Sequence, residues 1–145
     1  AEAILGEVDF VSIGTNDLTQ YTMAADRLLG DLAHLNNPWQ PAVLKMIKMT
    51  VEGAQRASVT AGKKKYVSVC GEAAADPALA VVLIGLGVDT LSMNAGAIPA
   101  VAAVLKSVTK EKAQQIAAIA LQQISSAEAK ESARKALPIL DELGL

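Results

Sequence analysis

Three short apolar runs, separated by longer stretches with helical periodicity, constrain the fold of this chain more than any other feature. The runs are VDFVSIG at 8–14, KYVSVCG at 65–71 and DTLSMNAG at 89–96, and each ends in small or polar residues. Runs of this length and composition are typical of β-strands. Because parallel neighbours need a long crossover connection, the alternation predicts right-handed βαβ units and a parallel sheet. The expected fold class is α/β.

The segments between and after these runs carry helix signals. The segment 41–62 has apolar residues at helical spacing, begins with proline and ends in glycine. The segment 77–87 follows Asp76, which is suited to an N-cap, and also ends in glycine. From about residue 97 the sequence changes to runs of good helix formers. We therefore expect two helices between the strands and a helical tail over 97–145.

Composition and charge exclude several classes of protein. The 145 residues are 52% hydrophobic, which suits a single domain with a substantial core. Thirteen basic and fifteen acidic side chains give a net charge of −2, too balanced to predict a nucleic-acid partner. The longest apolar stretch is shorter than the roughly 20 residues of a membrane span, so no membrane insertion is expected. A single cysteine and the lack of a signal-peptide pattern favour a reducing, cytoplasmic setting.

Polar side chains follow the first predicted strand. Thr15, Asn16 and Asp17 present a hydroxyl, an amide and a carboxylate directly after it. Ligands of parallel α/β proteins bind at the carboxyl ends of strands, so these residues are candidates for a binding site. Asp17 is suited to ligate a hard cation such as Mg²⁺, and Arg27 offers a planar fork for phosphate or carboxylate. The alternative is an Asx turn that caps a following helix, and the residues alone leave both interpretations open.

The second predicted strand ends in the only cysteine of the chain. Cys70 is followed by Gly71 and Glu72, at the edge of the sheet where ligands bind if the strand is parallel. A thiol there is suited to transfer a proton, because its ordinary pKa of about 8.5 lies close to neutral pH. A lone cysteine is in most proteins a small, inert, buried side chain, and this alternative also stays open.

Three other features favour structural roles. His34 is the only histidine, and its neighbours offer neither a second metal ligand nor a nucleophile, which indicates a hydrogen-bonded loop residue. Trp39 lies between two prolines and is expected to pack a loop against the core. The run GKKK at 62–65 predicts a solvated turn between a helix and a strand, with a basic patch for a partner as the alternative.

Two motifs, SIGTNDLTQYTMAADR at 12–27 and VCGEAAAD at 69–76, resemble a known family. With PWQPAVL between them, they are similar to the phosphoenolpyruvate-binding C-terminal domain of the phosphoenolpyruvate-protein phosphotransferases, enzyme I of the bacterial sugar phosphotransferase system. The wider family includes pyruvate phosphate dikinase and phosphoenolpyruvate synthase. The resemblance runs from about residue 7 to about residue 120, and VDTLSMNAGAIPAV at 88–101 belongs to it.

The resemblance implies a role for each candidate residue. Asp17 matches a magnesium-ligating aspartate, so Mg²⁺ is the expected cofactor. Asn16 and Arg27 match residues that hold the phosphate of phosphoenolpyruvate. Cys70 matches the cysteine that protonates the enolate after the phosphoryl group leaves, which yields pyruvate. Glu72 belongs to the matched motif and is assigned a supporting role beside the thiol or the substrate.

The resemblance also implies the architecture. The three strands would be the last three of a phosphoenolpyruvate-utilising (β/α)8 TIM barrel, and residues 1–145 would be the C-terminal portion of that domain. A start in what resembles the last turn of a helix agrees with a truncated chain. The barrel domain of the family dimerises, so a homodimer is expected.

The expected activity follows from the same resemblance. The parent enzyme would transfer the phosphoryl group of phosphoenolpyruvate to a protein histidine at the start of sugar uptake, with a phosphocarrier protein as its partner. The histidine that accepts the phosphoryl group, a second metal-binding carboxylate and further arginines lie outside this chain, so we expect the chain alone to be inactive. The alternatives are a relative of the dikinases or synthases and a noncatalytic dimerisation fragment.

Overall fold

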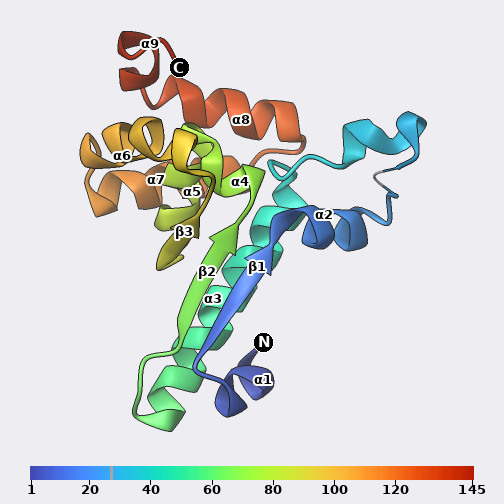
Figure 1. Ribbon diagram of the computed structural model, residues 1–145, viewed down its shortest axis with the longest axis vertical. Coiled ribbons are helices and arrows are strands. Elements are labelled where there is room, and N and C mark those ends of the chain that lie inside the picture. The colour runs from blue at the N-terminus through green and yellow to red at the C-terminus, as the bar shows by residue number, and fades with distance from the viewer. Residues whose placement is uncertain (27) are drawn as a thin grey trace.

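The computed structural model describes residues 1–26 and 28–145, and its helices and strands alternate along the chain (Figure 1). The candidate Arg27 lies outside the described residues. In chain order the elements are α1 (Glu2–Glu7), β1 (Phe10–Gly14), α2 (Thr15–Met23), the 3₁₀ helix η1 (Gly30–Leu35), α3 (Pro41–Ala61), β2 (Tyr66–Cys70), α4 (Glu72–Ala75), α5 (Pro77–Gly85), β3 (Thr90–Ser92), the 3₁₀ helix η2 (Ala95–Ala97), α6 (Ile98–Lys106), α7 (Lys110–Leu121), α8 (Ser126–Lys135) and α9 (Ile139–Glu142).

The three strands form a parallel sheet in the order β1-β2-β3, which confirms the α/β prediction. In the register of the sheet Gly14 pairs with Cys70, and Cys70 pairs with Ser92. The carboxyl ends of all three strands therefore lie at the same level. Side chains that follow each strand are brought to one edge of the sheet.

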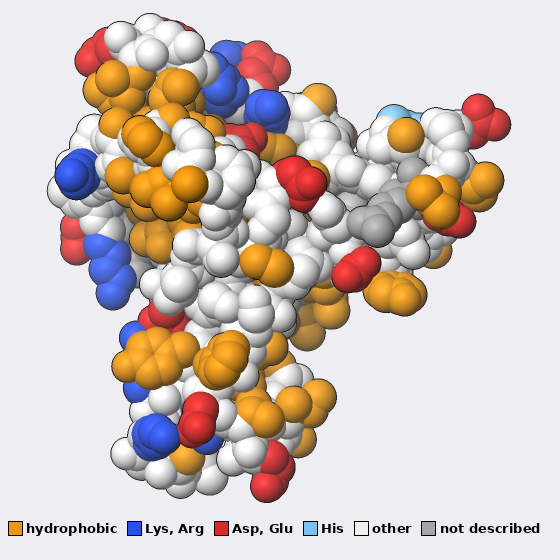
Figure 2. Space-filling view, viewed as in Figure 1, with side chains coloured by type: hydrophobic (Ala, Val, Ile, Leu, Met, Phe, Trp, Pro, Cys, Tyr) orange, Lys and Arg blue, Asp and Glu red, His pale blue; other side chains and the backbone are white. Residues whose placement is uncertain are grey.

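The two faces of the sheet differ in their covering. Val67 and Val69 of β2 and Ile13 of β1 are buried in the core, and α3 passes behind these strands in Figure 1. Because successive side chains of a strand point to opposite faces, the alternate residues lie on the other face. On that face, Phe10 is 63% exposed and Tyr66 is 50% exposed, and each is the first residue of its strand. Figure 2 shows hydrophobic side chains over the amino-terminal ends of these strands. Within the described residues, this second face has no helical layer (Figure 1).

The two helices predicted between the strands are confirmed, and their caps explain their limits. Proline occupies the first position of α3, and Gly62 adopts a left-handed conformation with φ 62° at its end. Asp76 caps α5, since its side chain accepts hydrogen bonds from the backbone N–H groups of Ala78 and Leu79. Residues 78–83 of α5 are all buried, as expected for a helix that is apolar on every side.

Helices occupy most of the predicted tail and enclose α5. The helix α5 packs against α6, α7 and α8. At the crossing with α7 the backbone of Gly85 approaches the carbonyl of Ala113 so closely that a Cβ atom on Gly85 would overlap it. Among the described residues, no helix combines the length and the apolar character needed to cross a membrane.

Two local predictions were right only in part. The third strand was expected over 89–96 but spans only Thr90–Ser92, because the side chain of Asn94 accepts a hydrogen bond from the N–H of Ala97 and starts η2. The turn at 62–65 is not solvated throughout. Lys65 is only 8% exposed, and its Nζ donates to the carbonyl oxygen of Val8 at 2.7 Å.

Candidate functional site

The carboxyl ends of the strands form a rim that we define by residues 14–17, 70–72 and 92–94. Backbone and side-chain hydrogen bonds connect its three parts. The hydroxyl of Thr15 donates to the carbonyl oxygen of Cys70 at 3.4 Å, and the N–H of Gly71 donates to the carbonyl oxygen of Ser92 at 3.2 Å. The two polar motifs of the sequence therefore meet at one place, as the parallel arrangement predicts.

A direct contact joins the two motifs. Nδ2 of Asn16 donates a hydrogen bond to Oε2 of Glu72 at 2.8 Å, although 56 residues separate them in the sequence. Both side chains are exposed at the rim. An amide N–H bound to a carboxylate is a charge-assisted hydrogen bond, which is shorter and stronger than a neutral one. Glu72 therefore orients the amide of Asn16.

Cys70 is half-buried and belongs to the face of the sheet that no helix of the described residues covers. Its Sγ lies 3.6 Å from the carbonyl oxygen of Ile13, to which the thiol can donate. The next residue, Gly71, has φ 90° and ψ −156°, a conformation that residues with a Cβ rarely adopt. The chain turns sharply at Gly71, so that Cys70 is the last residue of β2 and Glu72 is the first residue of α4.

Asp17 lies in the first turn of α2, directly after β1. A carboxylate at this position is favoured by the positive end of the helix dipole. Its side chain is exposed, and no group of three His, Cys, Asp or Glu residues suited to a metal ion occurs among the described residues. Mg²⁺ is commonly held by only one or two carboxylates together with substrate phosphates and water. Asp17 thus fits as one ligand of a shared magnesium shell.

A hollow of about 320 Å³ lies next to the Asn16–Glu72 contact. Asn36 and Pro38, from the segment between η1 and α3, line it together with Asn16, Thr19 and Glu72. The sequence did not single out Asn36 or Pro38, because no local pattern distinguishes loop residues that line a site from those that do not.

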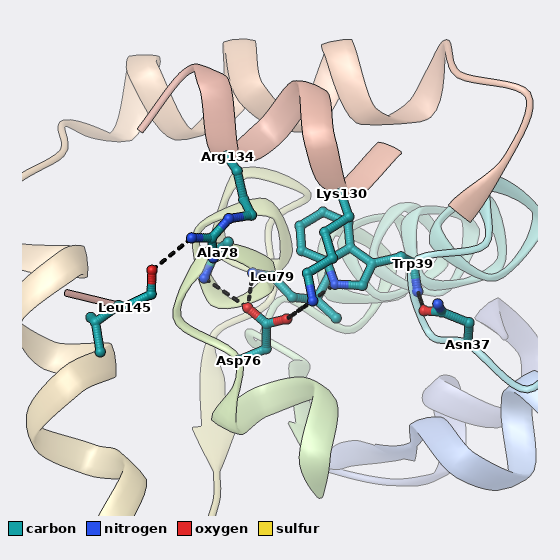
Figure 3. A network of polar contacts seen from close by, with 8 residues as sticks. All are labelled: Asn37, Trp39, Asp76, Ala78, Leu79, Lys130, Arg134 and Leu145. Carbon is teal, nitrogen blue, oxygen red and sulfur yellow. Dashed lines mark hydrogen bonds and ion pairs between the residues drawn. The ribbon is translucent and has the colours of Figure 1, made fainter. Parts of the chain in front are cut away.

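Of the residues given structural roles, His34 makes the predicted hydrogen bond and Trp39 packs into the core. Nδ1 of His34 lies 3.0 Å from the carbonyl oxygen of Asp31, which agrees with the predicted hydrogen bond, although His34 lies in the 3₁₀ helix η1 and not in a loop. Trp39 is 2% exposed and belongs to the core. Its indole N–H donates to Oδ2 of Asp76 at 3.1 Å (Figure 3), a contact that the sequence did not predict.

Comparison with known proteins identifies the family. The model of the family described as "PEP-utilising enzyme, PEP-binding domain" matches residues 1–110, which include the rim and the hollow. The chain belongs to this family. The PEP-utilising match covers both motifs and extends through α6 to the first residue of α7.

Several curated proteins are similar to this PEP-utilising chain. The phosphoenolpyruvate-protein phosphotransferase of Streptomyces coelicolor is 46% identical over 137 residues, which are 94% of the chain and 24% of that protein. Those of Geobacillus stearothermophilus and Bacillus subtilis are 45% and 40% identical over 116 and 114 residues, or 80% and 79% of the chain and 19% of each protein. The chain therefore spans a quarter or less of the length of these relatives.

Proposed function

We propose that the chain carries part of the phosphoenolpyruvate site of a phosphoenolpyruvate-protein phosphotransferase. This enzyme would transfer the phosphoryl group to a protein histidine, release pyruvate and start sugar uptake through a phosphocarrier protein. The names of the similar proteins favour this function over that of a dikinase or a synthase. The observation that supports it most is the Asn16–Glu72 contact, which unites the two motifs at the rim.

Asn16 and Arg27 are proposed to hold the phosphate. The amide of Asn16 has two N–H donors, and Glu72 accepts one of them, so the other remains for a phosphate oxygen. This arrangement gives Glu72 the supporting role expected of it. Phosphoryl transfer depends mainly on positioning and charge stabilisation, and a fixed amide and a guanidinium supply both.

Asp17 is proposed as a ligand of Mg²⁺. The ion, when bound, supplies positive charge that neutralises the phosphate oxygens. The carboxylate of Asp17 supplies negative charge at the rim, next to the amide of Asn16 that orients the phosphate. Further ligands would come from the substrate, from water and from parts of the enzyme outside this chain.

Cys70 is proposed to protonate the enolate. Once the phosphoryl group has left, the S–H bond breaks and a C–H bond forms at the methylene carbon, which gives pyruvate and a thiolate. Solvent returns the proton to the thiolate. The half-buried position of the thiol on the uncovered face of the sheet supports this role, because a substrate on that face can reach it.

The same proposal includes the architecture. We propose that β1, β2 and β3 are the last three strands of a (β/α)8 barrel, within the C-terminal portion of the enzyme, and that the enzyme is a cytoplasmic homodimer. Two observations support the barrel. Parallel sheets are normally covered on both faces, and here one face carries only short polar side chains and the exposed Phe10 and Tyr66. In addition, β1 and β3 each pair on one side only within the described residues.

Replacement of Cys70 tests the function. In the complete enzyme, Cys70→Ala is expected to lower the rate of pyruvate formation by about 10²-fold or more, because a positioned general acid is lost. Ser68→Ala is the matched control, since Ser68 lies two residues earlier on the same face of β2 and its hydroxyl donates only to the carbonyl oxygen of Val11. Pyruvate formation at the wild-type rate in Cys70→Ala would refute the role of the thiol.

A further inference from the structure

The carboxylate of Asp76 joins three segments that are far apart in the sequence (Figure 3). Its Oδ1 accepts hydrogen bonds from the N–H groups of Ala78 and Leu79 at 2.9 and 3.2 Å. Its Oδ2 accepts a hydrogen bond from Nε1 of Trp39 at 3.1 Å and lies 3.9 Å from Nζ of Lys130 in α8. One oxygen therefore caps α5, and the other binds the segment that leads into α3.

Trp39 connects Asp76 to the hollow beside the rim. Its ring is buried, and its backbone N–H donates to Oδ1 of Asn37 at 3.0 Å, so the turn that carries it is fixed at both ends. Asn36 and Pro38, which line the hollow, belong to the same turn as Trp39. Movement of the indole would therefore move one side of the hollow.

Asp76 is connected to the other side of the hollow through the backbone. Its N–H donates to the carbonyl oxygen of Glu72 at 3.1 Å, which closes the single turn of α4. The side chain of Glu72 in turn accepts the hydrogen bond from Asn16. A one-turn helix has little stability of its own, so its position depends on the residues that hold its end.

We propose that Asp76 is a positioning residue of the site, which holds Glu72 and the Asn36–Pro38 turn in a fixed relation by binding the indole of Trp39. The inference rests on the proposed function, since phosphoenolpyruvate bound at the rim is the ligand that depends on this relation. It adds a residue that acts through Glu72 and Asn16 without contact to the substrate.

Trp39→Phe in the complete enzyme is the decisive variant. The substitution removes the N–H donor, keeps an aromatic ring in the core and leaves the cap of α5 intact. The KM for phosphoenolpyruvate is expected to rise about fivefold, the equivalent of one hydrogen bond, while kcat stays within about twofold. Asp76→Ser keeps a capping oxygen for α5 and loses the indole contact, so its KM should rise by a similar factor.

The double variant tests whether the two residues act as one unit. If they do, Trp39→Phe combined with Asp76→Ser raises the KM no further than the larger single effect, because both changes remove the same contact. Independent, multiplied effects on the KM would overturn the proposal.

A matched control separates positioning from stability. Thr109→Ala removes the N-cap of α7, where the threonine hydroxyl accepts from the N–H of Lys112 at 3.2 Å, and Thr109 does not line the hollow. Destabilisation that irreversibly inactivates part of the enzyme lowers the apparent kcat and leaves the KM unchanged, so the kinetics are measured after incubation and removal of unfolded enzyme. The control should follow that pattern. If Trp39→Phe follows it as well, Asp76 is not a positioning residue.

A second measurement keeps this inference distinct from the proposed function. If the wild-type enzyme shows no turnover of phosphoenolpyruvate, the proposed function fails. The positioning of the rim is then read from the rate at which iodoacetamide alkylates Cys70, followed by mass spectrometry of the peptide that contains it. We expect a change of about twofold or more in Trp39→Phe and none in Thr109→Ala. Equal rates in wild type and Trp39→Phe would overturn the positioning role.

Discussion

Gly85→Ala should destabilise the protein more than its small size suggests. Gly85 is the last residue of α5, where that helix crosses α7. A Cβ atom there would overlap the carbonyl oxygen of Ala113 and lie 2.9 Å from Cβ of Ala117. The first of these atoms belongs to the backbone and cannot rotate away. The methyl group is therefore accommodated only if α5 and α7 move apart.

The magnitude follows from two opposing terms. Overpacking of a core costs about 1–3 kcal/mol, and a clash with backbone belongs at the upper end of this range. Alanine in place of glycine in a helix stabilises the folded protein by roughly 0.5–1 kcal/mol, because it lowers the entropy of the unfolded chain. The net loss of unfolding free energy is expected to be about 2 kcal/mol, which corresponds to a urea midpoint lower by about 1 M.

Urea unfolding followed by far-UV circular dichroism measures this loss, with Gly6→Ala as the control. Gly6 lies in α1, and a Cβ atom there would meet nothing within 4 Å, so the same substitution should leave the midpoint unchanged or raise it. If Gly85→Ala and Gly6→Ala shift the midpoint equally, the close packing of α5 on α7 does not limit stability, and the reasoning is refuted.

Two further outcomes are expected. The hydrogen bond from Lys63 to Asp9 at 2.9 Å holds the pKa of that carboxyl below its ordinary value, so the stabilisation is present at neutral pH and is lost as the pH falls through the lowered pKa. Lys63→Met should therefore be less stable than wild type at pH 7 but equal to it in strong acid, and a difference that persists in acid unfolding curves would contradict this. Residues 1–145 alone should not phosphorylate the histidine of a carrier protein from labelled phosphoenolpyruvate, and transfer of label by this chain would disprove that expectation.

Local signals predicted the helices whose ends are marked by proline, glycine or a capping side chain. Proline and glycine set the limits of α3, and Asp76 caps α5 as predicted, because these residues act through backbone geometry within one turn. The predicted third strand extends too far because Asn94 lies within the run and caps η2, which ends the strand earlier. The short elements α4 and η1 were not predicted, since helices of so few residues depend on tertiary contacts.

The rim could be predicted because parallel strands end at the same edge, so residues that follow each strand must meet. That rule brings Asn16 and Glu72 together without any information on their contact distance. No such rule joins Trp39 to Asp76. Each had a sufficient local explanation, Trp39 as a core residue and Asp76 as a helix cap. Their hydrogen bond forms only when the fold brings the segment before α3 next to the start of α5.

The pairing of Gly14 with Cys70 also limits how this sequence can change in length. Side chains alternate along a strand, so insertion or deletion of one residue within β2 would turn Cys70 towards α3 and expose Val69 in its place. Such a change would remove the thiol from the rim and a valine from the core at once. Length variation among relatives is therefore expected in the connecting segments, while the distance in residues from Tyr66 to Cys70 stays constant.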